Sequence, residues 1–172
     1  MELEKIYREK ILGIALDWDK ITLYSMYSLS ILVPLVIGKP QLVVGSIVNF
    51  LIVYSTLRYG IKKTLPILIL PSLTVLGTGM LFDGATYFLM YLTPFIIFSN
   101  SILSYFVSKK KPMYILLGVI SKGAFLVLVY RALMEYIGLP MIFLSSSYLQ
   151  FVTAFIGVLT AVTLYDFSKK KR

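Results

Sequence analysis

The stretch GVISKGAFLVLVYRALMEYIG, residues 118–138, decides the fold class. Nearly all of its side chains are apolar, and it is long enough to cross the ~30 Å hydrocarbon layer of a bilayer as one α-helix. Lys122 stands inside it, where a charged side chain is costly unless it faces a protein interior or a water-filled cavity. The stretch therefore predicts a membrane-spanning helix that carries one buried cation.

The whole chain has the composition of a membrane protein. Its 172 residues are 58% hydrophobic, above the ~45–50% of an average soluble domain, and its mean hydropathy is +0.85. Charged residues, prolines and glycines divide it into apolar stretches that are each near the ~20 residues of a spanning helix. We therefore predict an all-α integral membrane protein with a single bundle of six transmembrane helices. The six stretches are residues 21–37, 41–58, 64–82, 86–107, 113–137 and 141–165.

The connectors are short, so one domain uses most of the chain. We expect the transmembrane domain to cover residues 20–167, between an N-terminal segment of residues 1–19 and a basic tail of residues 168–172. The stretches 21–37 and 64–82 leave an alternative open, because they are short or interrupted by proline and also fit segments that dip into the bilayer without crossing it.

The net charge of +9 is distributed asymmetrically. Basic clusters follow the second and fourth stretches and end the chain, whereas the alternate connectors hold only Lys39 as a basic residue. The positive-inside rule makes the clustered side cytoplasmic, so both termini are predicted to be cytoplasmic. The clusters are interpreted as topology signals and lipid-headgroup contacts, with no nucleic-acid partner. They are Arg58, Lys62 and Lys63, then Lys109, Lys110 and Lys111, then Lys169, Lys170, Lys171 and Arg172.

The first twenty residues do not fit a secretory signal, because charges of both signs flank their apolar part and no small-residue cleavage site follows. Their apolar side chains recur at helical spacing, which favours a short amphipathic helix on the cytoplasmic interface, with a solvated tail as the alternative. The spaced residues are Leu3, Ile6, Tyr7, Ile11 and Ile14.

Much enzyme chemistry is excluded by composition. The chain contains neither cysteine nor histidine, which removes disulfides, thiol nucleophiles, imidazole bases and the zinc and haem sites built on those ligands. Nucleotide-binding loops, the G-x-S-x-G pattern and paired carboxylates at membrane depth are also missing from the sequence. We therefore expect no enzyme activity, no resident cofactor and no metal site.

Four strongly polar side chains are predicted at similar depths. Counting ~1.5 Å per residue from the ends of the stretches places Asn49 roughly 12 Å and Gln150 roughly 13 Å below the outer surface. The same count places Asn100 roughly 10 Å and Lys122 roughly 13 Å above the inner surface. We predict that they meet in the bundle interior, with Lys122 contacting amide oxygens or an anionic ligand group. A structural lysine bonded to helix carbonyls, or one that reaches the headgroups, is the alternative.

The last stretch carries a face of small and polar residues at spacings of three and four. Small side chains let helices approach closely, and Gln150 is the one large polar group on this face. We predict that the face packs into the bundle and brings Gln150 and Thr153 to the interior site, with an ordinary packing seam as the alternative. The face comprises Ser146, Ser147, Gln150, Thr153, Ala154, Gly157 and Ala161.

Two further features bear on a cavity. Pro66 and Pro71 in the third stretch predict a kinked helix whose freed carbonyl groups need partners, and broken helices near the bilayer centre are common at transporter binding sites. Aromatic side chains are expected mainly at the membrane interfaces and in the core. Periodicity does not decide whether four tyrosines line a cavity instead: Tyr24, Tyr27, Tyr91 and Tyr130.

From about residue 20 to residue 167, the chain resembles the small six-helix S components, which capture substrates for energy-coupling-factor (ECF) transporters. The order and spacing of several motifs together carry the resemblance, and it points to a group without an assigned substrate. The motifs are QLVVGSIVN (Gln41, Gly45, Asn49), PSLTVLGTG (Pro71, Gly77, Gly79), PFIIFSN (Pro94, Asn100), Lys122 and QFVTAFIG (Gln150, Thr153, Gly157).

The resemblance implies a substrate-binding subunit of an uptake transporter in the cell membrane. Such a subunit binds a small molecule, often a vitamin or metal ion, from outside, in a cavity in the outer half of the bundle. A membrane coupling subunit and two cytoplasmic ATPases then drive import. Asn49, Asn100, Lys122, Gln150 and Thr153 are the predicted substrate-binding residues.

The sequence departs from this family in one respect. Many S components dock through an Ala-x-x-x-Ala pattern in the first helix, and ITLYSMYSLSILVPLVIG contains no such pair. Docking then uses another seam, or the coupling partners do not exist. The main alternative to a receptor is a non-transporting membrane scaffold or assembly protein with the same fold.

Overall fold

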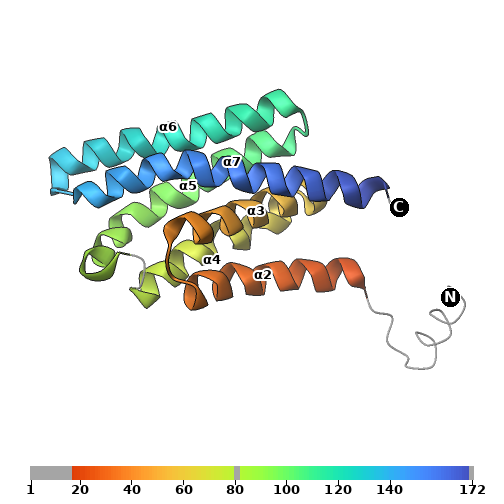
Figure 1. Ribbon diagram of the computed structural model, residues 1–172, viewed down its shortest axis with the longest axis horizontal. Coiled ribbons are helices and arrows are strands. Elements are labelled where there is room, and N and C mark those ends of the chain that lie inside the picture. Colours follow the sequence, from red (N-terminus) through yellow and green to blue (C-terminus); the bar gives the residue numbers. More distant parts are fainter. Residues whose placement is uncertain (1–16, 80–81, 171–172) are drawn as a thin grey trace, which may run out of the picture.

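The computed structural model describes residues 17–79 and 82–170. Within those ranges the chain forms six α-helices and one short 3-10 helix, which run up and down along one bundle (Figure 1). The predicted all-α bundle is therefore confirmed. The predicted amphipathic helix lies outside the described residues. The elements are α2 (Trp18–Val36), α3 (Gln41–Tyr59), α4 (Ile61–Thr78), η1 (Asp83–Phe88), α5 (Leu89–Ser108), α6 (Pro112–Ile137) and α7 (Met141–Lys170).

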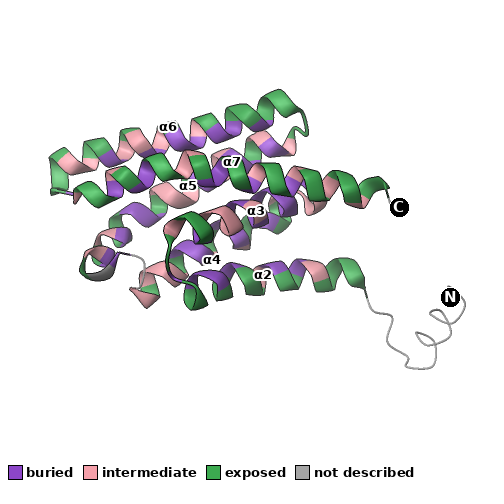
Figure 2. Cartoon of the chain, in the orientation of Figure 1, coloured by how far each residue is buried: buried purple, intermediate pink, exposed green. Residues whose placement is uncertain are grey.

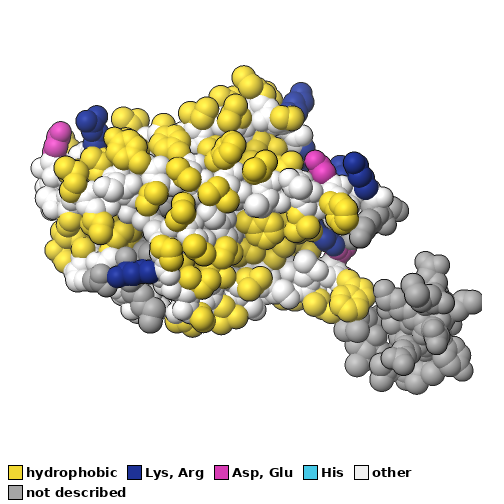
Figure 3. Space-filling view, in the orientation of Figure 1, with side chains coloured by type: hydrophobic (Ala, Val, Ile, Leu, Met, Phe, Trp, Pro, Cys, Tyr) yellow, Lys and Arg dark blue, Asp and Glu magenta, His cyan; other side chains and the backbone are white. Residues whose placement is uncertain are grey.

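Five of these helical segments are long and apolar enough to cross a membrane. Four of them are the helices α3, α4, α6 and α7. The fifth is a continuous segment, residues 84–108, that joins most of η1 to α5. The first helix, α2, is not among them, since Asp19 and Lys20 in its first turn lower its mean hydropathy. Charged side chains gather at the two ends of the bundle and leave an apolar band between them (Figure 3). The structure is that of a multi-pass membrane protein, and the crossing by α2 stays a prediction.

The helices begin and end where local chemistry requires it. Asp17 caps α2 by accepting hydrogen bonds from the backbone N–H groups of Asp19 and Lys20, both at 3.2 Å. The bond from the Lys20 backbone, aided by the Lys20 side chain, lowers the pKa of Asp17 below its ordinary value. Gly60 alone joins α3 to α4, and its φ of +82° is a conformation that favours glycine.

Most boundaries differ by a few residues from those predicted. The helix expected to reach residue 82 ends at Thr78, because Gly79 adopts the left-handed conformation. The helix expected from residue 86 starts as the 3-10 turn η1. The helix expected to end near residue 165 continues as α7 as far as Lys170. The prolines predicted to kink the third stretch lie inside a continuous α4.

Two apolar clusters fill the interior, one toward each end of the bundle. The cluster at the end with the basic residues includes Leu103 and Val119, and the cluster at the opposite end includes Leu92 and Leu126. Buried positions face inward on every helix (Figure 2), and α3 and α7 make the most extensive contact. A polar layer that includes Lys122 lies between the two clusters along α6.

Candidate functional site

Lys122 of α6 is the centre of a buried polar network. Its side chain is only 2% exposed, and its Nζ donates to Asn49 Oδ1 in α3 at 2.5 Å and to Asn100 Oδ1 in α5 at 2.7 Å. A lysine ammonium carries three N–H donors. These two bonds bring three helices together on one cation and leave one donor for another acceptor.

The two asparagines are oriented by the helices beside them. Asn49 Nδ2 donates to Gly45 O at 2.9 Å and to Thr153 Oγ1 of α7 at 3.1 Å. Asn100 Nδ2 donates to Leu68 O of α4 at 3.3 Å. Because both amide nitrogens are held in this way, both amide oxygens turn toward Lys122.

An open cavity lies above this network. Its volume is about 90 Å³, which is below the ~300–1,000 Å³ typical of drug-sized sites and suits a small molecule. Its floor includes Lys122, Asn49 and Asn100, and its upper wall includes Pro34 and Phe82. The cavity therefore opens toward the end of the bundle that holds the connectors after α2, α4 and α6. We call this the outer end, because the basic clusters lie at the opposite end.

Four of the five predicted site residues belong to one hydrogen-bonded network, namely Asn49, Asn100, Lys122 and Thr153, and the side chain of Gln150 lies beside it. Gln150 of α7 is half-buried and lines the cavity. In the described part of the chain its side-chain amide makes no hydrogen bond within the protein. Thr153 does not line the cavity. It is 1% exposed and supports the site through its bonds to Asn49 and to Gln150 O.

The predicted small-residue face of α7 does pack into the bundle. Thr153, Ala154 and Gly157 are buried, and the contact is with α3. Gly157 allows this contact, since any Cβ there would overlap Asn49. The prediction of an inward face is confirmed.

Sequence reasoning missed several cavity residues. Gln41 and Ser146 sit near the mouth, where Ser146 Oγ donates to Gln41 Oε1 at 2.8 Å. Ser72 of α4 and Thr93 of α5 line the wall. The spacing of small residues on α7 predicts the inward direction of Ser146, whereas Ser72 and Thr93 stand on mostly apolar helices without a periodic signal, and only the packing of the helices turns them toward the cavity.

One of the four undecided tyrosines lines the cavity. Tyr130 of α6 is 3% exposed and forms part of the cavity wall. Tyr24 and Tyr91 are at least half exposed on the outside of the bundle. Tyr27 belongs to the other end, where its hydroxyl donates to Lys63 O at 2.6 Å.

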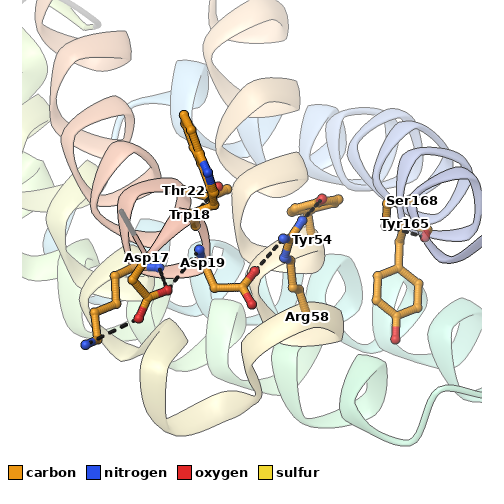
Figure 4. A network of polar contacts seen from close by, with 9 residues as sticks. Asp17, Trp18, Asp19, Thr22, Tyr54, Arg58, Tyr165 and Ser168 are labelled. Carbon is orange, nitrogen blue, oxygen red and sulfur yellow. Dashed lines mark hydrogen bonds and ion pairs between the residues drawn. The ribbon is translucent and has the colours of Figure 1, made fainter. Parts of the chain in front are cut away.

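A second polar network lies at the end of the bundle with the basic clusters (Figure 4). Arg58 of α3 bonds Asp19 Oδ1 of α2 at 2.5 Å and the Tyr54 hydroxyl at 2.9 Å. The Asp19 side chain is 53% exposed, so solvent screens this pair. The contact ties the first turn of α2 to α3 and has the character of a structural clasp.

The described lining of the cavity is mostly apolar, with a few amide, hydroxyl and amine groups. Among the described residues no group of three potential ligands for a metal ion occurs. The carboxylates whose exposure the structure describes are all exposed, and none of them lines the cavity: Asp17, Asp19, Glu135 and Asp166.

The chain was compared with known proteins. Neither a family model, nor a curated protein, nor a solved structure matches it.

Proposed function

We propose that the protein is a membrane receptor for a small molecule, the substrate-binding subunit of an ECF-type uptake transporter. The observation that carries the proposal is the cavity, which opens at the outer end and stops at Lys122 in the polar layer between the two apolar clusters. A molecule that enters from outside would reach polar groups sheltered from water and still lie within the bundle.

The geometry around Lys122 supports binding over a purely structural role. A buried charge needs compensation, and the two asparagine oxygens are its hydrogen-bond acceptors in the described part of the chain. Gln150 adds an amide on the cavity wall that has no protein partner there. The side-chain amide of Gln150 and the remaining N–H group of Lys122 can therefore form hydrogen bonds with a small molecule in the cavity.

Transport would require partners of this chain. In the proposal, a membrane coupling subunit and cytoplasmic ATPases supply the energy. Ser25 and Ser28 are small residues on the exposed side of α2, although this helix lacks the Ala-x-x-x-Ala pattern. Co-expression of the chain with candidate coupling subunits, followed by purification on a tag carried by this chain, tests that part separately.

Native mass spectrometry of the purified protein in mild detergent tests the receptor itself. We expect a bound small molecule that dissociates on activation, at a mass below that of a membrane lipid. A matched variant with Gln150→Leu, which removes one cavity amide, should retain less of it. Preparations that carry no small molecule, and that gain none from a metabolite extract, would contradict the proposal.

The second candidate is a scaffold with the same fold. It is favoured by the bonds that Asn49 and Asn100 make to main-chain oxygens, because a network closed on itself can stabilise a bundle without a ligand. The two candidates differ in the response of stability to loss of the lysine, which is argued in the Discussion.

A further inference from the structure

The floor of the cavity carries one formal charge, and it is positive. Lys122 is the only ionisable lysine, arginine, aspartate or glutamate among the lining residues described. Charged side chains at membrane depth pair with an opposite charge wherever one is available. Within the described side chains no carboxylate lines the cavity, and a negatively charged group of a bound molecule would supply an opposite charge for Lys122.

The remaining hydrogen-bond capacity of the floor consists largely of donors. Lys122 has used two of its three N–H groups. Asn100 Nδ2 has used one of its two, on Leu68 O. An acceptor group that lies between these two side chains would receive both remaining donors.

The walls above the floor are mostly apolar. Val44 and Val48 of α3, Val75 of α4 and Ile96 of α5 face the same space. Such walls favour a ligand with an apolar part, because they make van der Waals contacts with it and contain few hydrogen-bonding groups. The cavity is therefore polar at its closed end and apolar along its length.

Tyr130 adds a polar group nearer the mouth. Its side chain is 3% exposed and lines the cavity. Tyr130 follows Lys122 by eight residues on the same helix, which corresponds to about 12 Å along the axis. A phenol hydroxyl at this place can donate a hydrogen bond to a molecule in the cavity or accept one from it.

We propose that the cavity takes a small organic carboxylate, with its carboxylate between Lys122 Nζ and Asn100 Nδ2, its apolar body against α3, α4 and α5, and any second polar group near Tyr130. This inference rests on the proposed receptor function and names its substrate class. Carboxylate oxygens accept several charge-assisted hydrogen bonds at once, which matches the donors on the floor and the missing negative charge.

A matched pair of small probes tests the carboxylate. Benzoate and benzamide have the same shape and differ in charge, and benzylamine carries the opposite charge. Binding of each to the purified full-length protein in detergent is measured by ligand-observed NMR, where fragments of this size are expected to bind at about millimolar concentration. We expect benzoate to bind at least tenfold more tightly than benzamide and benzylamine not to bind.

A variant tests whether Lys122 causes the preference for benzoate over benzamide. Lys122→Met should remove the preference for benzoate, and Lys62→Met, at an exposed position at the opposite end, should keep it. The comparison of probes on the unmodified protein needs no variant, so it stays decisive even where Lys122→Met does not fold. Equal binding of benzoate and benzamide, no binding of benzoate at 50-fold its expected concentration, or benzoate binding retained by Lys122→Met would each overturn the inference.

Failure of this inference is distinguishable from failure of the receptor proposal. A co-purified neutral or cationic molecule would support the receptor proposal and contradict the inference that the substrate is a carboxylate. The same carboxylate chemistry can come from a soluble acid or from a fatty acid in the bilayer, so palmitate is tested as a competitor of benzoate in lipid nanodiscs. Competition assigns the lipid source, its absence assigns the soluble source, and both outcomes keep the carboxylate.

Discussion

Gly157 of α7 lies directly against Asn49 of α3. A Cβ atom on Gly157 would lie 2.6 Å from Asn49 Cβ and 2.6 Å from the backbone nitrogen of Phe50. Because backbone atoms cannot move aside like the end of a side chain, the missing Cβ at residue 157 sets how closely the two helices approach. The position of the Asn49 amide, and with it the contact to Lys122, depends on that approach.

Gly157→Ala should therefore destabilise the protein and weaken the site. We expect a loss of about 1–3 kcal/mol in unfolding free energy, typical of an overpacked interior, and reduced ligand binding because Asn49 moves. Gly77→Ala is the control, since Gly77 lies in α4 with open space around it, and alanine there should be neutral or stabilising by up to about 1 kcal/mol. Thermal unfolding in detergent gives both values, and equal melting temperatures for the two variants would contradict the role of Gly157.

Depth in the bundle could be predicted from the sequence, because the rise per residue of a helix is fixed. The count placed Asn49, Asn100, Lys122 and Gln150 near one level, and the structure has them on the floor and wall of one cavity. Hydrophobic length likewise predicted the bundle, and the spacing of small residues predicted the inward face of α7.

The direction in which a side chain points could not be predicted as well. On a helix that is apolar all round, the rotation about its axis is decided by its neighbours. For that reason Tyr130 could not be separated from Tyr24 and Tyr91, and Ser72 gave no signal at all. The end of α4 was missed because the sequence beyond Gly79 stays apolar, so the hydrophobic run gives no sign that Gly79 ends the helix.

Lys122→Met separates a receptor from a scaffold. In a receptor the substitution removes a buried charge that awaits a ligand, so stability should stay within about 1 kcal/mol of the original protein or rise. In a scaffold it breaks a satisfied network, and the loss should approach ~3–5 kcal/mol. We expect the first outcome in thermal unfolding without added ligand, with Lys62→Met as the matched control. A drop in melting temperature as large as that of a core truncation would favour the scaffold.

Ser72→Leu should block the cavity without weakening the fold. Ser72 lines the wall, and among the described residues its hydroxyl forms no hydrogen bond that the substitution would break. The larger side chain fills part of the open space, so ligand binding should fall at least tenfold while the melting temperature is unchanged or higher. Ser28→Leu places the same substitution on the exposed side of α2 and should leave binding intact. Normal binding by Ser72→Leu would show that the ligand occupies some other place.

The clasp between Asp19 and Arg58 should contribute little to stability. The Arg58 side chain is 21% exposed and that of Asp19 is 53% exposed, so water and salt screen the pair. Asp19→Asn should cost less than about 1 kcal/mol, and the difference should shrink further in 1 M salt. Unfolding at low and high salt measures it, and a large loss that does not respond to salt would mean that α2 depends on this contact for its place in the bundle.

Topology can be tested cleanly because the chain has no cysteine of its own. Single cysteines at Lys20, Lys39, Lys62 and Met141 stand at alternate ends of the bundle. In intact cells a membrane-impermeant maleimide should label the cysteines at residues 39 and 141, and it should reach those at residues 20 and 62 only after the membrane is opened. Labelling of both residue 20 and residue 39 from one side would show that α2 does not cross. Labelling of residue 62 from outside would show that the bundle has the opposite orientation in the membrane. The cavity would then open to the cytoplasm, and an uptake receptor could not bind its substrate from outside.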